Sequence, residues 1–209
     1  MKQGLALHTT SPELGVAIIN NQGKYRFNSW NLGKNLANNL HEKIVEFLPP
    51  LSWQDLTFIA VAKGPGSFTS TRIGVVTAKT LAQQLKIPVF GISTLESLAW
   101  YYGKKELNNP LLVVEMKANN EEVFGSIYQF SSSMTELSII IPDTLFKLEE
   151  WQDLVTQYQE KCNDNLKLII SSNKLAFTTE TLLEIALFKS KNTTDLTINN
   201  WQNLTPFYN

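Results

Sequence analysis

The chain has 209 residues, of which 43% are hydrophobic and 18% charged, and this balance excludes an intrinsically disordered protein. Its 18 Lys and Arg residues nearly cancel its 19 Asp and Glu residues, which gives a formal net charge of −1 and a pI near 6.1. A stand-alone RNA-binding module is not expected, because the chain has no overall positive field to attract a phosphate backbone.

The first half of the sequence predicts an alternation of strands and helices. Three short apolar or alternating segments, bounded by turn sequences, predict strands at residues 4–7, 15–19 and 24–30. Apolar residues then recur at helical spacing over residues 34–48, before Pro49 and Pro50. The remaining expected elements are strands at 57–62 and 87–91 and helices at 72–85 and 94–102, the last with Thr94 as its N-cap.

The second half repeats this order with different side chains. It predicts strands at 111–115, 122–130, 137–141 and 166–171, and helices at 145–158 and 178–188. The repeat favours an α/β fold of two tandem ribonuclease-H-like lobes, as in the actin and Hsp70 (ASKHA) superfamily, with a single mixed sheet as the alternative. The polar stretch 102–110 predicts the boundary between an N-terminal lobe, 1–102, and a C-terminal lobe, 103–209.

Cysteine and histidine are too scarce for a disulfide or a conventional zinc site. Cys162 is the only cysteine, and His8 and His41 lie far apart without nearby ligand residues. We therefore expect no metal site. The N-terminus lacks the apolar run of a signal peptide or membrane span, which predicts a cytoplasmic protein without membrane contact.

The most informative segment is KGPGSFTSTRIG at residues 63–74, between a predicted buried strand and a predicted helix. Its glycines give the backbone freedom for a sharp exit, and its hydroxyls can accept hydrogen bonds from the first free N–H groups of the helix. A capped turn is the favoured interpretation, and an anion site at the same N–H groups is the alternative. The residues expected to form this motif turn are Gly64, Pro65, Gly66, Ser67, Phe68, Thr69 and Arg72.

The sequence GPGSFTSTRIG, continuing through VVTAKTLAQQLKIPVFGISTLESLA, resembles the TsaB (YeaZ) family. LALHTTSPELGVAI resembles the opening strand pair of that family, LLVVEMKANNEEVFGSIYQF the start of its second lobe, and LTPFYN its C-terminal tail. The resemblance implies a part in making threonylcarbamoyladenosine at position 37 of tRNA.

Several positions depart from the usual pattern of that family. Ser70 stands where the family usually has Gly, and His8 where it usually has Asp. Residues 115–117 read Glu-Met-Lys in place of Asp-Ala-Arg, and the helix at 34–48 lacks a frequent His-Ser-Glu near its start. We interpret these departures as variation within the family, because the GPGSFT core is intact.

The resemblance implies a non-catalytic scaffold and activator rather than an enzyme. Such a chain would pair with TsaD, the homologous subunit that transfers the threonylcarbamoyl group, and would support the ATPase TsaE. It would form a homodimer when TsaD is absent and would contact tRNA only through the complex. TsaD is characterised by an His-x-x-x-His pair, which this sequence lacks. The alternative is an actin-like ATPase or a metallopeptidase-like hydrolase that acts alone.

The segments expected to hold ATP lack the residues that this task requires. Actin-like ATPases use two phosphate hairpins and a glycine-rich adenosine loop, because the backbone must approach the nucleotide closely. The corresponding hairpins, residues 8–13 and 116–120, contain neither Asp nor Gly, and no Gly follows Gly125. We therefore expect no catalytic residues, no independent ATPase activity and no cofactor of the chain's own, and leave open a nucleotide at the junction with the partner.

The predicted partner surface lies on the helices at 34–48 and 72–85. Small and apolar residues occupy one broad side of the second helix, and Ile73 and Val76 lie on the opposite flank, which is more than one core stripe needs. Small residues would let a TsaD helix approach, so a bulky residue at Gly74 or Ala78 should prevent pairing and leave the fold intact. Ordinary core on both faces is the alternative. The expected contact residues are Leu36, Leu40, Ile44, Phe47, Gly74, Val75, Ala78, Leu81 and Ala82.

Overall fold

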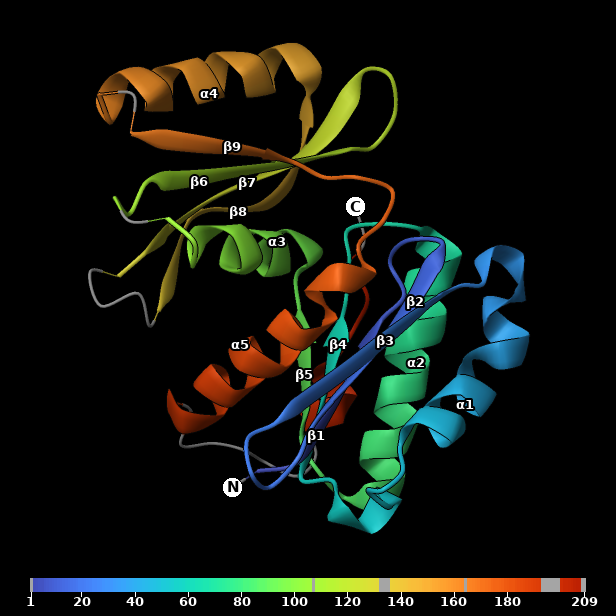
Figure 1. The fold of residues 1–209 in the computed structure, drawn as a ribbon. Helices are drawn as coiled ribbons and strands as arrows, with labels where there is room; N and C mark the ends of the chain where they lie inside the picture. Colours follow the sequence, from blue (N-terminus) through green and yellow to red (C-terminus); the bar gives the residue numbers. More distant parts are fainter. Residues whose placement is uncertain (1, 107, 132–135, 164, 193–199, 208–209) are drawn as a thin grey trace. The chain divides into compact units, whose positions relative to one another are not determined.

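The computed structural model describes residues 2–106, 108–131, 136–163, 165–192 and 200–207 (Figure 1). The chain forms two compact units. The first takes in the chain up to Thr94 and again from Asn173, and the second is Leu95–Ser172. No helix within the described ranges is long and apolar enough to cross a membrane.

The first unit is built on a five-stranded sheet with the order β3-β2-β1-β4-β5. β1 to β3 are antiparallel neighbours, and β4 and β5 run parallel to β1. The order and directions match the predicted ribonuclease-H-like lobe. The strands are β1 (Gly4–His8), β2 (Glu13–Ile19), β3 (Tyr25–Asn31), β4 (Phe58–Ala62) and β5 (Val89–Ile92).

Helices cover both faces of this sheet, with α1 and α2 on one side and α5 on the other (Figure 1). The face toward α1 and α2 carries branched side chains such as Leu7, Val16 and Val61, which form one buried cluster with both helices. The opposite face includes several small residues, such as Ala6, Gly15 and Ala17, and a Cβ on Gly15 would overlap the Thr179 hydroxyl. The helices are α1 (Leu36–Phe47), α2 (Phe68–Leu85) and α5 (Thr179–Asn192), with short 3-10 turns at Gly33–Asn35, Trp53–Asp55, Ala176–Thr178 and Asn200–Asn203.

The second unit repeats the same strand order without a fifth strand. Its sheet has the order β8-β7-β6-β9, in which β9 runs parallel to β6 and the other neighbours are antiparallel. The helices α3 and α4 lie on opposite faces of it (Figure 1). The elements are α3 (Thr94–Gly103), β6 (Leu111–Lys117), β7 (Glu122–Phe130), β8 (Leu137–Lys147), α4 (Leu148–Lys161) and β9 (Leu166–Ile170).

Trp151 anchors α4 to the second sheet. Its ring is fully buried, and its indole N–H donates a hydrogen bond to Glu115 Oε2 over 2.7 Å. Gly125 makes room for it, because a Cβ there would lie 2.5 Å from Trp151 Cε3. Glu115, one of the positions that depart from the family pattern, therefore satisfies a buried donor of the core.

The last helix of each half of the sequence belongs to the unit formed mainly by the other half. α3 follows the strands of the first sheet but packs in the second unit, where Gly103 lies against Leu112 and Phe130. α5 ends the second half but covers the first sheet. The division therefore differs from the expected boundary between 102 and 103.

Several predicted element boundaries are wrong. α2 begins at Phe68, a full turn before the predicted residue 72. β8 continues to Lys147, although a helix was predicted from 145, because Leu145 and Phe146 still pair with β7. Pro142 is accommodated because β8 is an edge strand, whose outer side needs no N–H donors.

Candidate functional site

The motif turn connects β4 to α2 and lies against the turn between β1 and β2. Gly64 and Gly66 have φ angles of +108° and +155°, a region that favours glycine. The Ser67 N–H donates a hydrogen bond to the carbonyl oxygen of Thr10 over 2.8 Å. A Cβ on Gly66 would lie 2.6 Å from Thr10 Cβ and closer still to that oxygen. Gly66 is thus required for the two turns to touch.

The motif hydroxyls do not cap α2 in the way that the sequence predicts. Ser67 is the N-cap residue, yet its side chain makes no capping hydrogen bond. Its hydroxyl donates to Ser70 Oγ over 3.2 Å, and Thr71 Oγ1 donates back to the Ser67 carbonyl oxygen over 2.7 Å. Ser70 and Thr71 lie inside α2 and Ser67 bonds to Ser70, so the first N–H groups of the helix have no side-chain cap from the N-cap residue.

A hollow of about 440 Å³, which we call the α1/α2 hollow, lies between the N-terminal ends of these two helices. It brings three motif residues, Ser67, Thr69 and Ser70, together with Lys34, which the sequence analysis did not single out. Hydroxyls and an ammonium group beside a helix N-terminus are groups that can bind an anion. The lining residues are Pro12, Gly33, Lys34, Leu36, Ala37, Ser67, Thr69, Ser70 and Ile73.

Most of the residues predicted to contact a partner lie in the core of the first unit instead. Those that are buried there are Leu36, Leu40, Ile44, Gly74, Val75, Ala78 and Ala82, whereas Phe47 and Leu81 are half-buried. The small residues of α2 allow the close approach of the chain's own β1 end. The prediction that the buried members form a partner surface is therefore wrong, since their side chains have no surface to offer.

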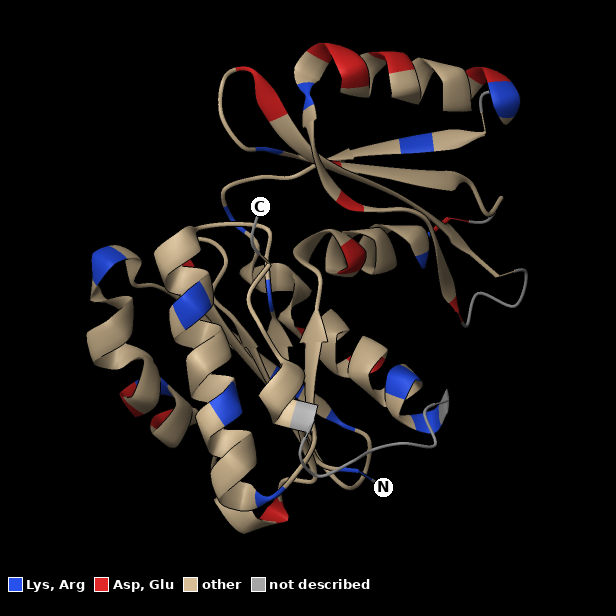
Figure 2. Ribbon diagram, turned by 180° about the vertical axis from the view of Figure 1, so that it is seen from behind, with Lys and Arg blue, Asp and Glu red and all other residues tan. Residues whose placement is uncertain are grey.

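The opposite flank of α2 is the exposed one. Thr69, Ile73, Val76 and Thr80 follow one another at helical spacing and form what we call the outer stripe, with Val76 59% exposed. The stripe is uncharged, and the only charged residues of α2 are two cations, Arg72 and Lys79 (Figure 2). An uncharged strip with an exposed valine at its centre is the kind of surface that can bind another protein.

Proteins of similar sequence show the family of this chain. A family model described as TsaD, tRNA N6-adenosine threonylcarbamoyltransferase, matches residues 34–197. The chain is 32% identical over 155 residues to the Bacillus subtilis tRNA threonylcarbamoyladenosine biosynthesis protein TsaB, covering 73% of this chain and 66% of that protein. It is 31% identical over 136 residues to the TsaB of Buchnera aphidicola subsp. Schizaphis graminum, covering 64% of each. The chain belongs to the TsaB family.

Solved structures confirm the fold class for the whole chain. YeaZ from Pseudomonas aeruginosa matches with a TM-score of 0.76 at 19% identity, covering 100% of both chains. Another Pseudomonas aeruginosa structure, described as similar to peptidase YEAZ, has a TM-score of 0.78 at 21% identity and covers 100% of this chain and 99% of its own. The sequence alignments with the TsaB relatives span just under two thirds of their length.

The family's usual Asp on the first strand is replaced here by a histidine that cannot act as a carboxylate. His8 is fully buried at the end of β1, and burial lowers its pKa to about 3, so the imidazole is neutral. Its Nδ1 lies 3.5 Å from Thr10 Oγ1, and its Nε2 has no hydrogen-bond partner among the described residues. This position of the TsaB-family chain brings no negative charge to the β1–β2 turn.

The β1–β2 and β6–β7 turns, which correspond to the two predicted hairpins, form hydrogen bonds within the chain. Glu13 accepts a hydrogen bond from the Ala176 N–H over 3.3 Å, and the Pro12 carbonyl accepts one from the Gly33 N–H over 2.9 Å. In the β6–β7 turn, Asn119 Oδ1 accepts from the N–H groups of Glu121 and Glu122. Within the described ranges no three His, Cys, Asp or Glu residues come close enough to share a metal ion.

Replacing Gly74 with alanine is expected to lower the free energy of unfolding by about 2 kcal/mol, contrary to the expectation that the fold tolerates bulk there. The new Cβ would overlap Thr9 Oγ1. That oxygen is buried without a hydrogen-bond partner in the described structure, so Thr9→Ala should remove the overlap at little cost. Urea unfolding of the two single variants and the double variant measures this. A double variant no more stable than Gly74→Ala would contradict the contact.

Proposed function

We propose that this chain is a non-catalytic scaffold and activator in the biosynthesis of threonylcarbamoyladenosine in tRNA, acting in the cytoplasm. It would pair with a TsaD-type subunit, support a TsaE-type ATPase and meet tRNA only within that complex. The observation that carries the proposal is the outer stripe of α2, which is uncharged, has Val76 exposed at its centre and lies beside Ala37 of α1. A second helical protein can cover such a stripe by ridge-and-groove packing.

The charged residues beside the outer stripe indicate which charges a partner should carry. Arg72 and Lys79 are the only charged residues of α2, and both are cations. A partner helix with an apolar centre and acidic residues at its rim would complement this surface, because rim charges set orientation and association rate. A second copy of the chain has the same cations at the same place, so a homodimer through this face should be the weaker complex.

The hairpins support a non-catalytic role. A phosphate hairpin needs backbone N–H groups free to reach a nucleotide. Here Thr9, Thr10 and Ser11 of the β1–β2 turn are buried, the residue before them is the buried neutral His8, and Glu13 adds a negative charge that repels phosphate. A nucleotide held at the junction with the partner remains part of the proposal, with the α1/α2 hollow and Lys34 as the groups that would face a phosphate.

Reconstitution with components omitted one at a time tests the role. The chain would be mixed with TsaD, TsaE, ATP, threonylcarbamoyl-adenylate and tRNA, and formation of the modified nucleoside measured. The proposal requires that modification is lost without this chain and that the chain alone hydrolyses no ATP and modifies no tRNA. Turnover by the purified chain alone would instead favour an independent hydrolase.

Val76→Glu is expected to reduce tRNA modification in this assay at least tenfold, because it places a carboxylate in the centre of the outer stripe, where association would have to bury it. The matched control is Ile170→Glu, which puts the same charge on a 67% exposed residue of β9 in the second unit. Co-purification with TsaD should follow the same order. Pairing that survives Val76→Glu, or is lost equally with Ile170→Glu, would show that the stripe is not the docking surface.

A further inference from the structure

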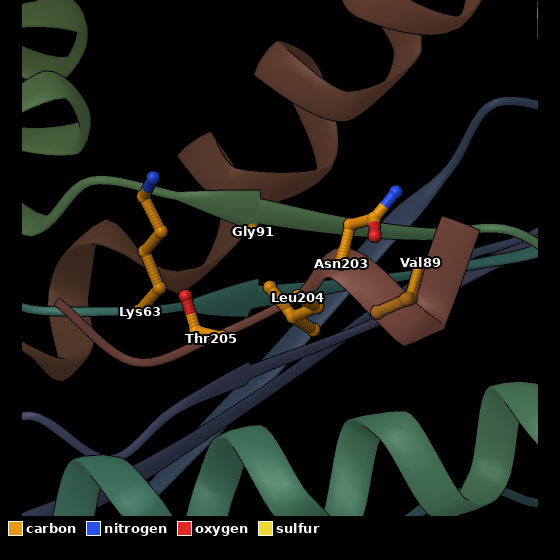
Figure 3. A pocket seen from close by; sticks show the side chains of 6 residues that line it. All are labelled: Lys63, Val89, Gly91, Asn203, Leu204 and Thr205. Carbon is orange, nitrogen blue, oxygen red and sulfur yellow. The ribbon is translucent and has the colours of Figure 1, made fainter.

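The second sheet ends at β9 without the cover that the first sheet has at the same place. In the first unit β5 pairs with the outer side of β4, and α2 and the C-terminal segment cover both strands, with Leu204 packed against Gly91 (Figure 3). In the described part of the second unit no strand lies beyond β9, and α4, the helix on the equivalent face, packs over β7 and β8. β9 is therefore an open edge strand.

This open strand exposes apolar side chains that a completed sheet would bury. Leu168 and Ile170 are 46% and 67% exposed. They lie on the α4 face of the sheet, because Val113, which pairs with Leu168, belongs to the buried cluster under α4. Ile59 and Val61, which face the helices from β4 in the first unit, are fully buried. The chain's own repeat thus shows how much cover is missing at β9.

The backbone groups of the same residues point away from the sheet. The carbonyl oxygen of Asn165 accepts a hydrogen bond from the Leu111 N–H of β6 over 3.0 Å, so residue 165 turns toward β6. Successive residues of a strand turn their N–H and C=O groups to alternate sides. Residues 166, 168 and 170 therefore turn these groups outward. We call Leu166, Leu168 and Ile170 the β9 edge.

The other edge of this sheet is protected against pairing with a further strand, whereas the β9 edge is not. β8 contains Pro142, and its pairing with β7 has register shifts, and both features hinder the addition of a strand. β9 contains no proline. Its one charged residue, Lys167, alternates with the β9 edge onto the opposite face, where it forms an ion pair with Glu106. No uncompensated charge of β9 opposes pairing with an identical strand.

We propose that two copies of this chain associate through the β9 edge and join their second sheets into one. A two-fold axis at Leu168 makes the two β9 strands antiparallel and places Leu168 opposite its own copy, with Leu166 of one chain opposite Ile170 of the other. Each pair exchanges two backbone hydrogen bonds, because the outward N–H and C=O groups face each other. The apolar side chains of the three pairs lie on one face and pack across the strands.

This dimer goes beyond the proposed role in tRNA modification and does not depend on it. The five residues that each copy contributes form a small interface, so we expect a reversible dimer rather than an obligate one. The dimer uses only the second unit and leaves the outer stripe of α2 free. The two surfaces can therefore be separated: Val76→Glu should leave self-association unchanged, and Ile170→Glu should weaken it without loss of pairing with TsaD.

Sedimentation velocity of the full chain over a range of concentrations tests the dimer. We expect a monomer–dimer equilibrium whose Kd rises at least tenfold with Leu168→Asp, because two carboxylates then lie opposite each other at the axis. The matched control is Ile139→Asp, at a 58% exposed residue of β8, which should leave the Kd unchanged. A chain that stays monomeric up to about 1 mM would overturn the proposal. A dimer that is equally sensitive to both substitutions, or sensitive only to Val76→Glu, would overturn it as well.

Disulfide cross-linking tests the register and does not require Leu168→Asp to fold. Leu168→Cys in a Cys162→Ser background places one thiol on each side of the axis. The Cα atoms of two residues that exchange both hydrogen bonds lie about 5.5 Å apart, which a disulfide can span. Oxidation should give a covalent dimer, whereas Ile139→Cys in the same background should stay monomeric. Cross-linking at residue 139 that equals or exceeds that at residue 168 would contradict the β9 edge.

Discussion

Replacing Gly66 with alanine is expected to lower the free energy of unfolding of the first unit by about 3 kcal/mol. The new Cβ would lie 2.6 Å from Thr10 Cβ and closer to the Thr10 carbonyl oxygen. That oxygen accepts the Ser67 N–H, so the chain cannot move it away without losing the hydrogen bond at the start of α2. The φ angle of +155° adds backbone strain for any residue with a side chain.

Gly33→Ala is the matched control, because Gly33 also lines the α1/α2 hollow and also has a positive φ, +49°. A Cβ there meets nothing within 4 Å, so only the left-handed backbone costs energy, about 1 kcal/mol. Urea unfolding followed by circular dichroism measures both variants. Equal losses would mean that the close approach of the motif turn to Thr10 contributes nothing to stability.

Gly66→Ala should also impair function more than Gly33→Ala does. A displaced Ser67 would move the first turn of α2 and the hydroxyls of the α1/α2 hollow. The rate of tRNA modification in the reconstituted system should therefore fall further for Gly66→Ala at a temperature where both variants are folded. This separates the stability of the turn from its part in the proposed complex.

The strand order of both units follows from local patterns that the sequence displays. Apolar alternation and turn residues place the strands, and the repeat of the same order predicts two lobes of one topology. Such patterns do not predict in which unit α3 and α5 pack. The apolar residues Leu182, Leu183 and Ala186 show that α5 is a buried helix, but a periodicity cannot say which sheet it covers. Here the small residues opposite Thr179 decide it.

The candidate site, too, can be predicted only in part from the sequence. The sequence indicates that α2 is apolar on two flanks, and small residues such as Gly74 and Ala78 suggest a close approach by some neighbour. Only the structure identifies that neighbour as Thr9 for Gly74, and it leaves Val76 exposed and Ile73 half-buried on the opposite flank.

Acid is expected to destabilise the first unit through His8, beginning near pH 6.5. In the unfolded chain the imidazole takes up a proton near its ordinary pKa of 6.5, whereas burial lowers the pKa in the folded chain to about 3. Between these values the unfolded state binds more protons, so the free energy of unfolding decreases as the pH falls, by up to about 1.4 kcal/mol per pH unit. The full contribution of neutral His8 is present above pH 6.5, and at most about 5 kcal/mol is lost by pH 3.

His8→Gln isolates this contribution, because glutamine is uncharged at every pH and retains a polar group near Thr10. We expect the variant to be the less stable one at pH 7.5, where it loses the native packing, but to have a flatter pH profile between pH 6.5 and 4.5. His8→Asn serves the same purpose if the longer side chain does not fit, and His41→Asn, on the exposed side of α1, should keep the wild-type slope. Urea unfolding at a series of pH values measures the slopes. A wild-type slope retained in both His8 variants would mean that other groups, and not the buried imidazole, control acid stability.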